Sequence, residues 1–260
     1  MVARDRRRRK GTWRCQPLAG CPASDAPLAL AQEAGVQVLL VNPVCNLRDC
    51  PPLKTERRDG LTPEQPARWE QLIHQAGEHY GRNRWQCVQL LEQARRIDDG
   101  HAGLHYLLGE CYDALEMYDK AREAYIRAKE LDICPLPILE EMNQAILETA
   151  DRTGTPVVDV RRIFEMTSDH GIPDNRYLLD HVHPTIEGHQ LIGAALCGEL
   201  IRQGIVHPVD GWKEVRKELF QKHLDSLDNL YFLRGMERLE ALRCWTQGKT
   251  DGAVSKKESS

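Results

Sequence analysis

The chain has no long hydrophobic run and no recognisable leader segment. No stretch approaches the roughly 18 apolar residues that a membrane helix needs, so no membrane span is expected. Residues 4–10 are strongly charged, but no apolar run follows them as it would in a secretory signal peptide. These two absences favour a cytoplasmic location, although the sequence does not name the compartment.

Neither the charge nor the cysteine spacing indicates nucleic acid, a metal or a cofactor as a partner. The net charge is -4, and the basic run at residues 6–10 is expected to be a solvated tail. The 9 cysteines include no CxxC pair, and the closest pairs are Cys15 with Cys21 and Cys45 with Cys50. This spacing fits neither a zinc site nor a secreted disulfide framework, so most cysteines are expected to be buried thiols.

The N-terminal part predicts a short α/β segment behind an irregular start. Residues 1–24 are rich in Arg, Cys, Gly and Pro without periodicity, and they are expected to be disordered or foreign to the fold. A short helix is predicted over residues 28–34. Residues 36–42 are apolar and mostly Val or Leu, which is typical of a buried parallel strand. Residues 25–56 are therefore expected to form the first part of an α/β domain.

Residues 63–135 have helical periodicity and resemble tetratricopeptide repeats. Six side chains fall at the offsets of one repeat of about 34 residues: Leu108, Gly109, Tyr112, Ala121, Tyr125 and Ala128. Residues 69–97 match a second repeat more loosely. The small Gly109 and Ala121 are expected to let two antiparallel helices approach closely. A lone apolar helix pair is the alternative, whereas the repeat interpretation implies an insert that can bind a protein partner.

A second α/β segment and further helices follow. A helix, an apolar strand over residues 155–160 and a helix over residues 185–202 indicate that residues 136–206 are the second part of the α/β domain. Residues 211–247 are predicted to be helical, and the polar tail at residues 248–260 is predicted to be disordered.

The most specific motif is Asp-His-Val-His-Pro at residues 180–184, followed by Gly-His at residues 188–189. A histidine can take the proton of a weak hydroxyl nucleophile, and a nearby carboxylate holds the imidazole in the required tautomer. Over residues 136–203 the chain resembles the SGNH/GDSL hydrolase family through this Asp-x-x-His-Pro motif. The resemblance implies that His183 is the general base, that Asp180 orients it, and that the substrate is an acyl ester, such as one on a sugar or a lipid.

The resemblance also implies an oxyanion donor and a fold. Asn46, in the loop after the first predicted strand, would donate to the oxyanion. Asn42 is the competing asparagine, but it lies on the predicted strand. The implied fold is a three-layer α/β/α domain that is N-terminally incomplete and is interrupted by the tetratricopeptide-like insert.

Two other interpretations of the motif stay open. Asp180, His181 and His183 could bind a metal, but no further cluster of Cys, His or Glu stands at ligand spacing. A plain structural loop is the other alternative. His181 and His189 are expected to be a loop residue and a helix-surface residue, without a catalytic role.

The serine nucleophile that the family needs has no suitable position. Ser24 precedes Asn46 without a strand before it, and their separation of 22 residues is too short for two βα units, each about 30 residues long. The other serines lack a strand–turn–helix context: Ser168, Ser226, Ser255, Ser259 and Ser260. We therefore expect either a partial, inactive ester hydrolase of the SGNH/GDSL type, or a helical-repeat interaction protein on a non-catalytic hydrolase scaffold.

Overall fold

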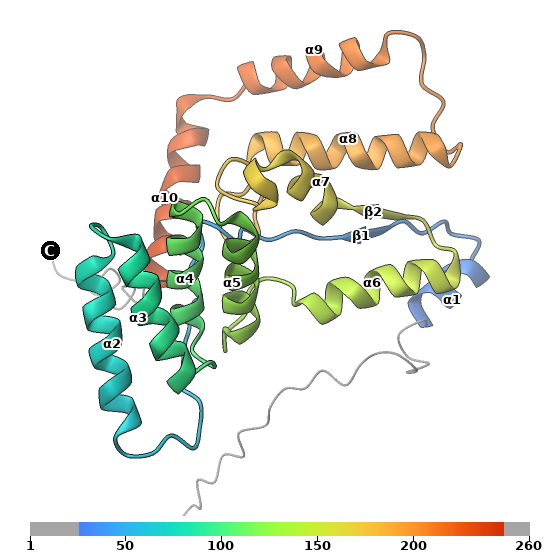
Figure 1. Ribbon diagram of the computed structural model, residues 1–260. Helices are drawn as coiled ribbons and strands as arrows, with labels where there is room; N and C mark the ends of the chain where they lie inside the picture. The colour runs from blue at the N-terminus through green and yellow to red at the C-terminus, as the bar shows by residue number, and fades with distance from the viewer. Residues whose placement is uncertain (1–25, 247–260) are drawn as a thin grey trace, which may run out of the picture.

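The computed structural model describes residues 26–246, which form a mostly helical chain with one small sheet (Figure 1). The expected disordered ends, residues 1–24 and 248–260, lie outside the described residues. The elements are α1 (Ala26–Glu33), β1 (Leu40–Asn42), α2 (Gln65–His79), α3 (Arg84–Ile97), α4 (Ala102–Ala114), α5 (Tyr118–Leu131), α6 (Glu140–Thr153), β2 (Val157–Asp159), α7 (Val160–Thr167), a 3-10 turn (Asp169–Gly171), α8 (Ile186–Arg202), α9 (Trp212–Asp225) and α10 (Asn229–Thr246).

Helices α2 to α5 form two successive helical hairpins around a shared apolar core (Figure 1). The side chains of Asn83 and His101 cap the N-termini of α3 and α4 by accepting backbone N–H groups. The core lies between α2, α3, α4 and α5 and contains Trp69, Leu72, Ala76, Cys87, Val88, Leu91, Ala94, Leu104, Leu108, Cys111 and Ala124. These helices bury their apolar stripes against sequence neighbours, so the hairpins need no distant partner.

The predicted close approach of two helices at Gly109 is confirmed. A Cβ atom added to Gly109 would lie 2.6 Å from Cδ1 of Tyr125, so the aromatic ring on α5 occupies the space that a side chain on α4 would need. Ala121 and Ala128, also predicted at this contact, are 0% and 1% exposed. Small residues on both helices therefore allow α4 and α5 to pack closely.

The two predicted strands pair with each other in parallel, but only over three residues each. Leu40 lies opposite Val157, Val41 opposite Val158, and Asn42 opposite Asp159. Figure 1 shows the strands between α6 on one side and α8 on the other. The first apolar run therefore contributes only its last three residues to the sheet, and Val36 at its start is 59% exposed.

The expected three-layer α/β/α fold of the SGNH type is wrong for this chain. Of the described residues, 62% are helical and 4% are extended, and the sheet has two strands. A sheet layer requires several strands to bury a face, whereas here each short strand has one neighbour and leaves an unpaired edge. The sequence contains only two apolar strand signals, and most of the remaining chain has helical periodicity, so a sheet layer does not form.

The start of α8 is held by the motif that precedes it. Thr185 caps the helix, because its hydroxyl accepts the N–H of Gly188 at 3.1 Å. A Cβ atom at Gly188 would collide with the carbonyl oxygen of Tyr177, so only glycine permits this approach.

None of the described helices combines the length and the apolar character that crossing a membrane requires.

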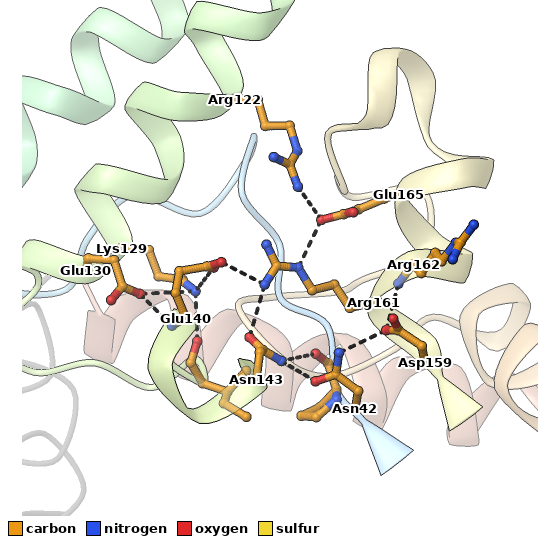
Figure 2. Close-up of polar contacts among 12 residues, drawn as sticks. Asn42, Arg122, Lys129, Glu130, Glu140, Asn143, Asp159, Arg161, Arg162 and Glu165 are labelled. Atoms are coloured by element: carbon orange, nitrogen blue, oxygen red, sulfur yellow. Dashed lines mark hydrogen bonds and ion pairs between the residues drawn. The ribbon is translucent and has the colours of Figure 1, made fainter. Parts of the chain in front are cut away.

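A polar network joins the helical hairpins to the strands (Figure 2). Arg161 on α7 donates to Glu140 on α6 at 2.7 Å and to Glu165 at 3.0 Å. Lys129 on α5 donates to the other oxygen of Glu140 at 2.7 Å. Burial raises the pKa of Glu140, but its hydrogen bonds and ion pairs with Lys129 and Arg161 outweigh burial and lower the pKa. The same network reaches the strands through Asn143, whose amide donates to the side chain of Asn42 on β1 at 2.6 Å.

Candidate functional site

The Asp-His-Val-His-Pro motif forms a tight loop between the core and α8. Leu178 and Pro184 make an isolated antiparallel bridge, and the N–H of Leu179 donates to the carbonyl of His183 at 2.7 Å. Leu178 is completely buried and anchors the loop in the apolar cluster around Phe164. The bridge and the buried anchor hold the two ends of the loop together, so its tip presents residues 180–183.

Asp180 and His183 are in direct contact, as the sequence predicted. Nδ1 of His183 lies 2.8 Å from Oδ2 and 3.0 Å from Oδ1 of Asp180. The side chain of His183 is 69% exposed, and that of Asp180 is 11% exposed. The carboxylate therefore holds Nδ1–H, which leaves Nε2 as the basic nitrogen, and Nε2 makes no hydrogen bond to another described residue.

The loop backbone keeps Asp180 ionised. Burial raises the pKa of this carboxyl, but the N–H groups of Val182 and His183 and the imidazole of His183 outweigh burial, so the pKa is lowered. The two N–H groups donate to Oδ1 of Asp180 at 2.8 and 2.9 Å. A carboxylate fixed in this way can orient a histidine and stabilise the imidazolium form during proton transfer.

Asn46 lies beside the same loop, and its side-chain amide is partly engaged. Its backbone N–H donates to the carbonyl of His181 at 3.0 Å, and its side-chain amide donates to Oδ1 of Asn175 at 2.8 Å. The side chain lines a water-sized cavity of about 10 Å³ together with His181, and His183 is not among the lining residues. The bond to Asn175 uses one of the two N–H groups of the amide, and Asn46 is 3% exposed, so an oxyanion role would depend on the second N–H and on opening of the surface above it. Asn42, the competing asparagine, is 1% exposed and donates to Asp159 across the strands at 2.9 Å.

Arg48 fixes the Asn46 loop to two other parts of the chain. Its guanidinium donates to Asp113 at the end of α4 at 2.7 Å, and to Asp174 at 3.2 Å. Asp49 accepts the N–H of Asn175 at 2.8 Å. Sequence reasoning assigned no role to Arg48 or Asn175, because their side-chain partners lie 65 to 129 residues away along the chain. The only local signal was the clustering of Asn, Arg and Asp directly after a predicted strand.

No serine in the described part of the chain can serve as the nucleophile. The Ser168 hydroxyl is buried and makes no hydrogen bond, so no histidine activates it. The Ser226 hydroxyl lies at the end of α9 and donates to the carbonyl of His223 at 2.6 Å. Ser24, Ser255, Ser259 and Ser260 lie outside the described residues.

The other histidines of the motif have structural positions. His181 lies in a loop, as expected, but it is buried at 7% exposed, and its Nε2 lies 2.9 Å from the carbonyl oxygen of Pro51. His189 is exposed on the first turn of α8. Across residues 26–246, no group of three or more Cys, His, Asp or Glu side chains could hold a metal ion.

The fold and the site together define a mostly helical protein that carries an exposed, carboxylate-oriented histidine beside a two-stranded parallel sheet. No protein-family model, curated protein or solved structure matches the chain.

Proposed function

We propose that the chain carries the general-base pair of an ester-hydrolysing site of the SGNH/GDSL type, with His183 as base and Asp180 as its orienting carboxylate. The substrate class is an acyl ester of a sugar or a lipid. The single observation that supports this proposal is the contact of His183 Nδ1 with both oxygens of Asp180, together with an exposed and unoccupied Nε2.

The chemistry available to this pair is base-catalysed attack by water. Nε2 of His183 takes a proton while the water oxygen attacks the ester carbonyl, and Asp180 stabilises the resulting imidazolium. The same proton then passes to the alkoxide that leaves when the tetrahedral intermediate collapses. Because no described serine lies in reach of the base, we expect slow turnover without an acyl-enzyme and therefore without a burst.

Hydrolysis of an activated acetyl ester tests this role directly. We expect His183→Ala to reduce the protein-dependent rate by roughly 10²-fold, the lower range for loss of a positioned base. His189→Ala is the matched control, because His189 is also exposed but makes no ion pair with a carboxylate within residues 26–246, and its rate should equal that of the unaltered protein. Equal rates for the unaltered protein and His183→Ala would refute the proposal.

Protein binding by α2 to α5 is a second candidate function, favoured by a cleft of about 540 Å³ between α3, α4 and α5. Its floor contains Leu108 and Ala124, and its walls carry charges of both signs: Glu92, Arg95, Asp99, Lys120, Glu123 and Arg127. Walls with charges of both signs suit an extended peptide that carries both acidic and basic side chains, whereas Leu108 and Ala124 are only 1% and 8% exposed and offer little apolar surface.

A peptide library tests this second function. Peptides with both charge signs should be enriched on the intact protein, and the double change Lys120→Glu with Arg127→Glu should reduce that binding at least about tenfold. Arg68→Glu on the exposed surface of α2 is the control and should leave binding unchanged. Equal enrichment on the double variant would exclude this cleft as the binding site.

A further inference from the structure

Two cysteines in the core of the helical hairpins have their sulfur atoms in contact. The Sγ atoms of Cys87 on α3 and Cys111 on α4 are 3.4 Å apart, and the thiol of Cys111 donates to Cys87. Both side chains are buried, at 1% and 0% exposed, in the apolar core shared by α2 to α5. The two positions are 24 residues apart in the sequence, so it is the packing of α3 against α4 that brings the two thiols together.

Little rearrangement would turn this contact into a covalent bond. A disulfide holds its sulfur atoms at about 2.05 Å, so the two Sγ atoms would have to approach by roughly 1.4 Å. The facing helices already hold the two side chains against each other, and a modest rotation about each Cα–Cβ bond can supply the remaining approach.

The surroundings favour Cys87 as the sulfur that reacts first. Burial raises the pKa of the Cys87 thiol, but the hydrogen bond from Cys111 and the positive charge of Arg84 partly offset that rise. Burial and the contact with Cys87 raise the pKa of Cys111 to about 12, although Arg84 lowers it in part. Because the thiolate is the nucleophilic form, Cys87 is the better nucleophile of the pair.

The position of Cys87 near the end of a helix gives an oxidant a route to it. Helix α3 begins at Arg84, so Cys87 lies in its first turn, directly after the exposed Trp85 and Gln86. Helix ends open locally at a far lower free-energy cost than a closed core. Opening of this turn would expose Cys87 to a small oxidant while Cys111 stays in the middle of the hairpin core.

We propose that Cys87 and Cys111 form a reversible disulfide that locks α3 to α4 when hydrogen peroxide is present. The Cys87 thiolate attacks one oxygen of the peroxide, the O–O bond breaks, and Cys87 becomes a sulfenic acid as hydroxide leaves. The Cys111 sulfur then attacks the sulfur of Cys87, the S–S bond forms, and the departing hydroxide takes the thiol proton to give water. Two thiols are oxidised, and one peroxide is reduced to two molecules of water.

The lock would act on helices that line the charged cleft described above. Arg95 on α3 and His105 on α4 both line that cleft. A bond between the two helices closes a loop that spans 24 residues, which restricts the unfolded chain and therefore stabilises the folded hairpins. This inference goes beyond the proposed hydrolytic role and does not depend on His183.

Peptide mapping of the oxidised full chain identifies the bond directly. Trypsin releases Cys87 within residues 85–95 and Cys111 within residues 97–120, and each of these peptides contains one cysteine. After treatment with hydrogen peroxide and alkylation of the remaining thiols, we expect the two peptides to be joined, and dithiothreitol to separate them. Oxidation should also raise the melting temperature by at least about 4 °C, and dithiothreitol should reverse the rise.

Two variants and a fold check complete the test. Cys134→Ser is the matched control, because it removes an exposed cysteine and should leave the link and the melting shift intact. Cys87→Ala should show neither, with unchanged helix content by circular dichroism. If its helix content falls, the peptide map of the unaltered protein decides the question. Alkylation of both cysteines after peroxide, a link from either of them to another cysteine, oxidation of Cys87 to a sulfonic acid, or a link without a melting shift would each overturn the proposal.

Discussion

The helical hairpins and the strand region of this chain differ sharply in how completely they bury themselves. In α2 to α5, Leu72, Leu91 and Leu108 are 1–2% exposed, and the core is continuous. Around the strands, α8 is apolar along most of its length, yet only Gly188 among its residues is buried. The hairpins are thus closed units, whereas the strand region leaves apolar surface partly open.

The difference follows from the range of the contacts that each region needs. A helix satisfies its own backbone hydrogen bonds, and a hairpin buries its apolar stripe against the next helix in the sequence. A strand needs partners from elsewhere in the chain, and β1 finds its partner β2 more than a hundred residues later. Two strands of three residues cannot cover the helices beside them.

The largest expected effect contrasts the two regions directly. Leu108→Ala should lower the free energy of unfolding by about 2–5 kcal/mol, because it opens a cavity in the closed hairpin core. Leu196→Ala on α8 should cost only about 1 kcal/mol, because this side chain is only partly buried and its site can fill with water. Urea unfolding followed by circular dichroism measures both changes. Equal costs would mean that the two regions are packed equally well.

Next in size is the contact at Gly109. Gly109→Ala should destabilise the protein by about 1–3 kcal/mol, because the added methyl group would meet the ring of Tyr125. Gly77→Ala on α2 is the control, since a Cβ atom there meets nothing within 4 Å. That variant should be stabilised by roughly 0.5–1 kcal/mol through helix propensity. Thermal melting of both variants would show opposite shifts, and a neutral Gly109→Ala would count against the close helix contact.

The polar junction between the two regions should have a smaller effect. Arg161→Met removes the donors to Glu140 and Glu165 and should cost about 1–2 kcal/mol. Arg162→Met, at the exposed neighbouring position, should leave stability unchanged. Chemical denaturation gives both values. If the two variants behave alike, the network in Figure 2 contributes nothing to the attachment of the hairpins.

The smallest expected effect is a pH dependence from Asp180. Its folded-state pKa is lowered, so its stabilising contribution is complete above the unfolded-state pKa of about 3.9 and is lost as pH falls through the folded-state pKa. Asp180→Asn should therefore flatten the acid limb of a stability–pH curve. Asp169→Asn changes an exposed carboxylate, so its unfolding free energy should depend on acidic pH in the same way as that of the unaltered protein. An unchanged limb in Asp180→Asn would contradict the hydrogen-bonded state of Asp180.

Local patterns in the sequence predicted the elements well and the architecture poorly. Helix periodicity and the small residues at Gly109 and Ala121 were sufficient for the hairpins, because those contacts are near in sequence. Each of the two apolar runs contains a strand, as predicted, but only over three residues, and Val36 and Val41 in the first run are exposed. The three-layer fold was wrong because it was taken from the family resemblance, which supplied strands that this chain does not form.

The candidate site divides in the same way. Asp180 and His183 are three residues apart, and their contact follows from one tight loop, so the motif alone predicted it. The engagement of Asn46 by Asn175 spans 129 residues and could not be read from either segment. Long-range polar partners such as these depend on the fold, which local spacing does not determine.

A fluorophosphonate probe followed by intact-mass measurement and peptide mapping tests the central claim most directly, namely that His183 acts on water and not on a serine of this chain. We predict no adduct on any serine, because neither Ser168 nor Ser226 lies in hydrogen-bond reach of His183. A stoichiometric adduct that disappears in His183→Ala would contradict the claim, and an adduct on Ser24 would identify the nucleophile that the spacing argument rejected.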